Sequence, residues 1–274
     1  MRSATDPAAE KVVVDPNEID AKGGTEIDYF EPSHDRKLVA VSLSRGGSES
    51  GDVHVYDTAK GNELADVIPR VNNGTAGGSV AWRQDNQGFY YTRYPRAGER
   101  PAADLDFYQQ VWFHKLGTPV SADTYSLGKD FPRIAEILLS SSDDGRYILA
   151  QMANGDGGEF AHYLLSPDGQ WTQVTRLADS VTGAVFGGND SLWLVSRLGS
   201  QRGKVLRMPL SKPDLAGAQT VVPESKSAIQ GVIARRIACT SSIRPADPCR
   251  SECSTTREGR KGWFHSLRHH PSGE

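Results

Sequence analysis

The sequence predicts an all-β protein, and more specifically a partial β-propeller of about four to five blades with four antiparallel strands each. Short stretches alternate apolar and polar residues, as half-buried strands do, and helical periodicity is almost absent. One unit also recurs four times, marked by Asp35, Asp85, Asp144 and Asp190, which lie 50, 59 and 46 residues apart. Regular all-β units of about 40–50 residues are typical of propeller blades.

Each unit has the same internal order. An acidic or Asp-Gly-like turn comes first, followed by a strand, a glycine- or serine-rich loop and a second strand. The predicted strand pairs are, in chain order, 38–43 with 53–56, 88–93 with 110–114, 146–150 with 160–165, and 191–196 with 204–208. Asp, Asn and Gly suit the turns because they tolerate positive φ. A β-sandwich is the competing architecture, but its strands need not recur in matched sets.

The composition excludes several classes of protein. Among 274 residues, 24% are charged and 8% aromatic, which is typical of a soluble globular chain. The formal net charge of -3 argues against nucleic acid or an anionic membrane as the main partner. No apolar run approaches the roughly 18 residues of a membrane helix, and the polar start lacks the apolar region of a signal peptide. A cytoplasmic location is therefore expected.

Five segments, in this order, resemble prolyl oligopeptidases: 14–17, 88–95, 113–119, 142–147 and 206–210. The runs Tyr-Thr-Arg-Tyr-Pro (91–95) and His-Lys-Leu-Gly-Thr-Pro (114–119) are the most specific of them. The resemblance covers about Lys11–Ile233. It implies a seven-bladed propeller above an α/β-hydrolase domain that carries a Ser-Asp-His triad. In that family the propeller admits only short peptides, which are cut after proline.

The resemblance reaches only the propeller, so the expected function is that of a non-catalytic gating fragment whose hydrolase domain is missing. Such a fragment would meet short proline-containing peptides only together with that domain. Two alternatives stay open. The chain is a free-standing propeller that binds a protein or peptide partner, or it associates with a second chain through open blade edges, which are prone to pairing. No cofactor is expected.

The composition changes near Arg235. We expect a leader at 1–10, propeller blades over 11–233, and an aberrant, disordered tail at 234–274 in which nothing alternates as a strand would. Our hypothesis is that the tail results from a frameshift, because another reading frame of its codons allows a strand, a Gly-Gly loop and a second strand. Codons in the gene that are incompatible with this reading would contradict it. Nine and three residues separate Cys239, Cys249 and Cys253, which fits no zinc site even with His265, His269 and His270 nearby.

No catalytic or metal-binding residue is predicted. The Gly-x-Ser-x-Gly turn of an α/β-hydrolase nucleophile is absent, and the nearest sequence, Gly46–Gly51, has the wrong spacing and suits a hairpin loop. Four histidines of the blades each lie alone, in a turn or in a strand: His34, His54, His114 and His162. His54 and His114 occupy alternating strand positions and are expected to be satisfied by packing. The loop 155–158 is expected to be a hairpin connection, since no helix follows to bind phosphate and its acids lack calcium-loop spacing.

Three rim residues are the substrate-binding candidates. Arg93, Tyr94 and Arg96 are cationic or aromatic and are expected at the edge of a blade, where they could face substrate or the missing domain; a solvated rim is the alternative. The segment 72–79 lies where relatives place residues near the peptide pocket, but here it is glycine-rich and has no aromatic residue. The tryptophans of the strands are expected to pack between blades: Trp82, Trp112, Trp171 and Trp193.

Overall fold

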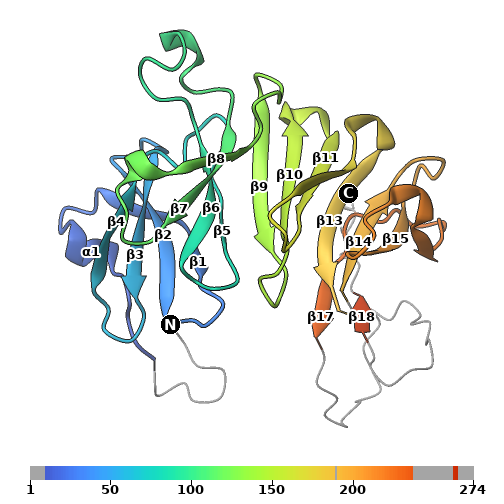
Figure 1. The fold of residues 1–274 in the computed structure, drawn as a ribbon, viewed down its shortest axis with the longest axis horizontal. Coiled ribbons are helices and arrows are strands. Elements are labelled where there is room, and N and C mark those ends of the chain that lie inside the picture. Colours follow the sequence, from blue (N-terminus) through green and yellow to red (C-terminus); the bar gives the residue numbers. More distant parts are fainter. Residues whose placement is uncertain (1–9, 189, 237–261, 265–274) are drawn as a thin grey trace, which may run out of the picture. The chain divides into compact units, whose positions relative to one another are not determined.

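The computed structural model describes residues 10–188, 190–236 and 262–264 (Figure 1). Within these residues, regular structure is almost entirely strand. The one α-helix of this part of the chain, α1 (Pro16–Ile19), has Asp15 as its N-cap, whose side chain accepts from the backbone N of Asn17. Short 3-10 turns lie at η2 (Ala102–Asp104), η3 (Val120–Ala122), η4 (Gly155–Gly157), η5 (Leu177–Asp179) and η6 (Leu215–Gly217).

The strands form four antiparallel sheets of four strands each, in the order of the chain (Figure 1). The first contains β1 (Thr25–Pro32), β2 (Leu38–Arg45), β3 (Gly51–Asp57) and β4 (Glu63–Ile68). The second contains β5 (Val80–Trp82), β6 (Gly88–Arg93), β7 (Gln110–Lys115) and β8 (Thr124–Leu127). The third contains β9 (Ala135–Ser141), β10 (Ile148–Asn154), β11 (Phe160–Leu165) and β12 (Trp171–Thr175). The fourth contains β13 (Val181–Gly187), β14 (Ser191–Ser196), β15 (Lys204–Pro209) and β16 (Gln219–Val222).

Four-stranded meanders repeated along a chain are the blades of a propeller. The prediction of an all-β, partial β-propeller is therefore confirmed. The blade starts differ from the expected positions. The four aspartates near 35, 85, 144 and 190 lie in the turn between the first and second strand of each sheet, so the sheets begin at Thr25, Val80, Ala135 and Val181.

Two of the first strands, β5 and β1, have weak patterns. β5 has only three residues, and β1 has a register shift between Ile27 and Tyr29 that breaks its alternation. The aspartate turns were recognisable because their chemistry is local. The carboxylate of Asp35 accepts from the backbone N of Lys37 at 3.1 Å, and that of Asp144 accepts from the backbone N of Arg146 at 3.1 Å. A turn of this type is closed by the side chain two residues before the bonded N–H.

The chain divides into two compact units, Met1–Gly157 with Tyr163–Trp171 and Gly158–His162 with Thr172–Glu274. The first unit has a continuous core between its first two sheets, formed by Ala40, Val53, Val55, Ile68, Val71, Val80, Trp82, Phe89 and Tyr91. In the second unit, the buried apolar side chains of the fourth sheet include Leu192, Leu194, Val205 and Met208.

Neighbouring sheets of the first unit are also joined by hydrogen bonds from side chains to strand edges. The indole N–H of Trp82 donates to the carbonyl of Glu31 in β1 at 2.8 Å. The Ser79 hydroxyl donates to the carbonyl of Ile137 in β9 at 3.1 Å and accepts from the backbone N of Leu139 at 3.0 Å. These bonds satisfy backbone groups that an edge strand would otherwise leave unpaired.

The predicted tail, 234–274, lies mostly outside the described residues. Its described parts are β17 (Ala234–Arg236) and β18 (Gly262–Phe264), which pair antiparallel. These six residues differ from the expectation of a segment without strands, and the aromatic residues Trp263 and Phe264 suit a strand because aromatic residues favour extended backbone. Cys239, Cys249, Cys253, His265, His269 and His270 are not among the described residues.

Candidate functional site

Loops of the first unit gather at one end of its sheets, which we call the loop end. It consists of the connections 46–50, 69–79, 94–109 and 128–134 together with η4. Successive strands of a meander run in opposite directions, so every second connection emerges at the same end. Hydrogen bonds join the second, third and fourth of these loops to one another.

Arg93 and Tyr94, two of the predicted rim residues, are buried at the base of this end. Arg93 is only 6% exposed, its guanidinium lies 3.8 Å from the ring centroid of Trp112, and its Nη2 donates to both carboxylate oxygens of Glu99 at 2.9 and 2.7 Å. Tyr94 is 2% exposed. Its hydroxyl donates to the carbonyl of Gly77 at 2.8 Å and accepts from the backbone N of Ala76 at 3.1 Å.

Burial raises the pKa of Tyr94 to about 12, so its hydroxyl stays protonated. Tyr94, the first residue after β6, thus supplies an aromatic side chain to the segment 72–79, which itself has none. The Nη2 of Arg93 and the hydroxyl of Tyr94 are both engaged in hydrogen bonds within the protein, whereas the Nε of Arg93 is buried without a hydrogen-bond partner.

Arg96, the third rim residue, is placed differently. Its backbone N donates to Glu99 Oε2 at 2.9 Å, which fixes the backbone beside Arg93. Its side chain is half-buried, and its guanidinium forms no ion pair with the residues that the structure describes. Of the three candidates, Arg96 is the one whose side chain is not buried, although its charge acts on the nearby Glu99.

The long loop 94–109 is held by contacts that the sequence does not reveal. Asp106 Oδ1 accepts from Arg70 Nη2 at 2.7 Å and from Asn73 Nδ2 at 2.9 Å. Arg133 Nε donates to Asp104 at 2.8 Å, and its guanidinium lies 3.6 Å from the ring centroid of Phe107. In each of these hydrogen bonds the two residues are 29 to 36 positions apart, so no local sequence pattern predicts the pairing.

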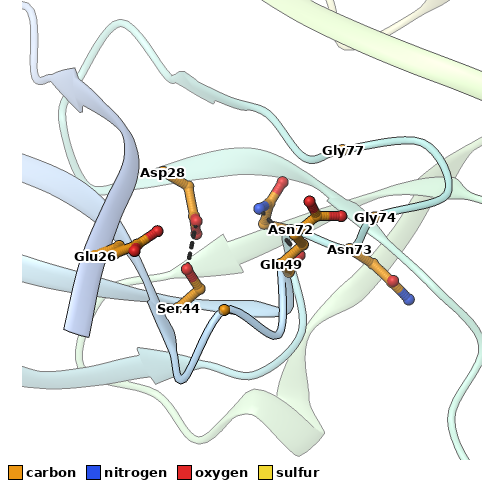
Figure 2. A pocket seen from close by; sticks show the side chains of 9 residues that line it. Glu26, Asp28, Ser44, Glu49, Asn72, Asn73, Gly74 and Gly77 are labelled. Atoms are coloured by element: carbon orange, nitrogen blue, oxygen red, sulfur yellow. Dashed lines mark hydrogen bonds between the residues drawn. The ribbon is translucent and has the colours of Figure 1, made fainter. Parts of the chain in front are cut away.

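Two pockets open beside the segment 72–77. The first, of about 260 Å³, brings together carboxylates and small polar groups (Figure 2), and its lining consists of Glu26, Asp28, Ser44, Gly47, Glu49, Asn72, Asn73, Gly74 and Gly77. Figure 2 shows Glu26 and Asp28 on one side of it and Glu49 on the other. Asp28 is held in place because its two oxygens accept from the hydroxyls of Ser42 and Ser44, each at 2.7 Å.

The second pocket, of about 250 Å³, lies on the other side of the same segment and is lined by Thr75, Ala76, Asp106, Phe107, Arg133, Ile134, Ala135, Glu136, Gly155 and Asp156. It mixes an aromatic and an aliphatic wall with charged groups. Burial, with a smaller contribution from the nearby Asp156 carboxylate, raises the pKa of Glu136. The expected hairpin at 155–158 is formed, since η4 connects β10 to β11.

The histidines of the blades are each engaged with neighbouring groups. His34 Nε2 lies 3.0 Å from the carbonyl of Trp82, His54 Nδ1 lies 2.6 Å from Glu63, and His162 Nδ1 lies 2.7 Å from the Thr175 hydroxyl. His114 lies between Asp66 and Asp123. Packing by satisfied groups was the expectation, but the two carboxylates around His114 could not be foreseen, since Asp66 lies 48 residues away in sequence.

Of the tryptophans, Trp82 and Trp171 pack between sheets as expected. Trp82 belongs to the core of the first unit, and Trp171 of β12 meets Tyr90 of β6 edge-on at 6.3 Å. Trp112 also packs against the core between the first two sheets, and the guanidinium of Arg93 lies over its ring. Trp193 lies opposite Arg207 in the neighbouring strand of its own sheet.

Within the described ranges, no three His, Cys, Asp or Glu side chains are grouped as metal ligands would be. No helix of the described chain has the length and apolar character needed to cross a membrane.

Known proteins share this architecture. Residues 1–236 match the family model for the prolyl oligopeptidase N-terminal beta-propeller domain. The chain is 26% identical over 224 residues to a prolyl endopeptidase of Elizabethkingia meningoseptica, an alignment that covers 80% of this chain and 31% of the relative. It is 22% identical over 244 residues to prolyl oligopeptidase A of Amanita bisporigera, covering 78% and 31%.

Solved structures show the same fold. A structure from a study of two prolyl endopeptidases superimposes with a TM-score of 0.69 at 24% identity, over 81% of this chain and 32% of that one. Oligopeptidase B from Leishmania major gives a TM-score of 0.66 at 18% identity, over 86% and 32%. The chain thus spans about a third of the length of these relatives.

Proposed function

The chain belongs to the prolyl oligopeptidase N-terminal β-propeller family, and on this premise we propose that it is the non-catalytic, substrate-gating part of a serine endopeptidase that cleaves short peptides after proline. The observation that supports this most strongly is the family match over residues 1–236, which includes all four sheets. Catalysis belongs, in this proposal, to an α/β-hydrolase domain outside the printed sequence.

The loop end is the surface that we assign to gating. In this proposal Arg96 contacts the peptide, because its guanidinium is free of ion pairs with described residues. Arg93 and Tyr94 act as positioning residues, since one holds Glu99 and the other holds the segment 72–79.

Turnover of a proline-linked chromogenic peptide tests the first half of the proposal. We expect the chain alone to give near-zero turnover, because it has no Gly-x-Ser-x-Gly nucleophile turn. Turnover that a serine-directed inhibitor abolishes would contradict this.

A chimera tests gating itself. Residues 11–233 replace the matched segment of the Elizabethkingia meningoseptica prolyl endopeptidase, and cleavage of a short peptide is compared with cleavage of a denatured protein that carries the same proline site. We expect the short peptide to be cleaved and the protein to be rejected. A folded chimera that cuts both at equal rates would overturn the gating role.

Two alternatives remain: a free-standing propeller that binds a partner, and self-association through blade edges. The behaviour of the chain in solution distinguishes them from the gating proposal. Light scattering during size-exclusion chromatography distinguishes a monomer from a dimer or larger species. Thermal melting then shows whether a monomer unfolds cooperatively, as a binding propeller should.

A further inference from the structure

The most unusual polar group of the molecule lies outside the loop end. The imidazole of His114, in β7, is fully buried, and each of its two nitrogens faces a carboxylate. Nδ1 lies 2.7 Å from Asp123 Oδ1, and Nε2 lies 3.1 Å from Asp66 Oδ1. Both aspartate side chains are themselves buried.

The hydrogen-bond partners of His114 favour one arrangement of the protons. An ionised carboxylate only accepts hydrogen bonds, whereas a neutral imidazole has one N–H donor and one acceptor nitrogen. Each carboxylate already receives a second donor. The Tyr91 hydroxyl donates to Asp123 Oδ2 at 2.6 Å, and the backbone N of Gly117 donates to Asp66 Oδ1 at 2.6 Å. With both aspartates acting as acceptors, both imidazole nitrogens must be donors, which is the charged imidazolium form.

The same contacts join two sheets. Asp66 belongs to β4 of the first sheet, while His114 and Tyr91 belong to β7 and β6 of the second, and Asp123 precedes β8. Asp66, Asp123 and Tyr91 are the titratable groups that contact the imidazole or its two carboxylates among the described residues. The positive charges of Arg93 and Arg96 oppose the rise in the pKa of Tyr91 that burial causes. Both arginines also donate hydrogen bonds to Glu99. The ring of Phe89 closes one side at 5.5 Å between centroids.

We propose that His114 is a buried imidazolium whose proton holds the first sheet to the second, so that the junction between the two blades weakens as the pH rises. Loss of one proton would leave one of the two facing carboxylates without its donor, inside the protein, where an unpaired charge is costly. The junction would then open or admit water.

The electrostatic balance agrees with the geometry. Burial works against the charged imidazole, but the hydrogen bonds and charges of Asp123 and Asp66 outweigh it, and the pKa of His114 is raised. The pKa of an unfolded histidine is about 6.5. A raised value in the folded state gives a stabilisation that is complete below about pH 6.5 and is lost as the pH rises through the folded pKa.

His162 provides a matched control with the opposite sign. It is also fully buried, but its Nδ1 partner is the neutral Thr175 hydroxyl, and burial lowers its pKa to about 4. Its contribution to stability is therefore present above about pH 6.5 and declines as the pH falls towards 4. Substitution of His162 should therefore not change how stability depends on pH above about pH 6.5.

The protonation state is measured directly by NMR on the full chain with ¹⁵N-labelled histidine. We expect both ring nitrogens of His114 to show imidazolium shifts at pH 7, with a titration midpoint above the ordinary histidine value of about 6.5. A neutral tautomer of His114 at pH 7 would overturn the proposal, and this measurement needs no variant.

Thermal unfolding at pH 6 and pH 9 tests the consequence. We expect the advantage in Tm of the wild type over H114Q to shrink on going to pH 9, by about 2–4 °C for each fivefold loss in the folding equilibrium constant. D66N, which keeps an acceptor but removes the charge, should show a smaller pH dependence than the wild type. H162Q should change in the opposite direction: the advantage in Tm of the wild type over H162Q should increase from pH 6 to pH 9, because the His162 contribution already declines below about pH 6.5. A difference between wild type and H114Q that is the same at both pH values would contradict the proposed junction.

Discussion

At the scale of single residues, the polar side chains that sequence reasoning selects for function are partly used to hold the fold. Arg93 and Tyr94 are cationic or aromatic at the end of a strand, which suits a binding rim, yet the structure buries both of them. The reason is that the strand β6 ends below the long loop 94–109, and these two side chains turn inward to fix it. Of the three rim residues, only Arg96 has a charged side chain that forms no ion pair with a described residue.

Alanine substitutions separate the two roles. R93A loses a stacked guanidinium and two charged hydrogen bonds, so we expect the free energy of unfolding to fall by about 2–4 kcal/mol. R96A should stay within about 0.5 kcal/mol of the wild type, because it removes a side chain without an ion pair. Urea unfolding measures both. Equal losses for the two variants would show that Arg96 is also a structural residue.

At the scale of elements, the sequence identifies strands whose ends are marked by local chemistry. β2, β6, β10 and β14 each follow an aspartate turn, and alternating or continuously apolar residues mark their length. The first strands, β1, β5, β9 and β13, were not identified as blade starts because no such turn precedes them. Loop 94–109 is the opposite case, since its 16 residues carry no strand pattern and its shape depends on Arg70, Arg93 and Arg133 from other elements.

Asp106 is the point at which this loop can be released. Its carboxylate accepts hydrogen bonds from Arg70 and Asn73, and its backbone carbonyl accepts one from the Thr75 hydroxyl. D106A should cost about 1–2 kcal/mol of local stability, which raises the population of the open loop about five- to thirtyfold. Limited trypsin digestion should then cut faster after Arg96, which is followed by Ala97.

The matched control is D130N, because Asp130 is exposed and has no side-chain contact to the described residues. Its digestion rate should equal that of the wild type. If D106A and D130N are cut equally slowly, the loop does not depend on the Asp106 contacts.

At the scale of the whole molecule, a stack of sheets must cover the apolar faces of its outer members. The first sheet has a second cluster on the face away from the main core, consisting of Val39, Val41, Leu43 and Tyr56. Val13 and Val14 pack against this cluster from the segment that precedes α1. The face expected to be open is thus partly covered by the chain itself.

Charge introduced into this cover tests its importance. V13D or V14D would place a carboxylate against an apolar cluster, and we expect a loss of about 2 kcal/mol or more in stability together with association of the chain. V12D is the control, because Val12 is 65% exposed. Light scattering and thermal melting measure both effects. The cover would be unimportant if V14D and V12D behaved alike.

The sequence by itself determined the repeated strand unit, the all-β class and, through five ordered segments, the resemblance to the family. These features are local or periodic: an aspartate turn and an alternating strand are specified by residues within about ten positions of one another. Tertiary structure alone decided the inward use of Arg93 and Tyr94, the anchoring of the loop 94–109, and the position of His114 between Asp66 and Asp123. Each of these joins residues from different strands or loops, and in the last case from different sheets. Their charges and hydrogen bonds acquire meaning only after the sheets have packed and excluded water.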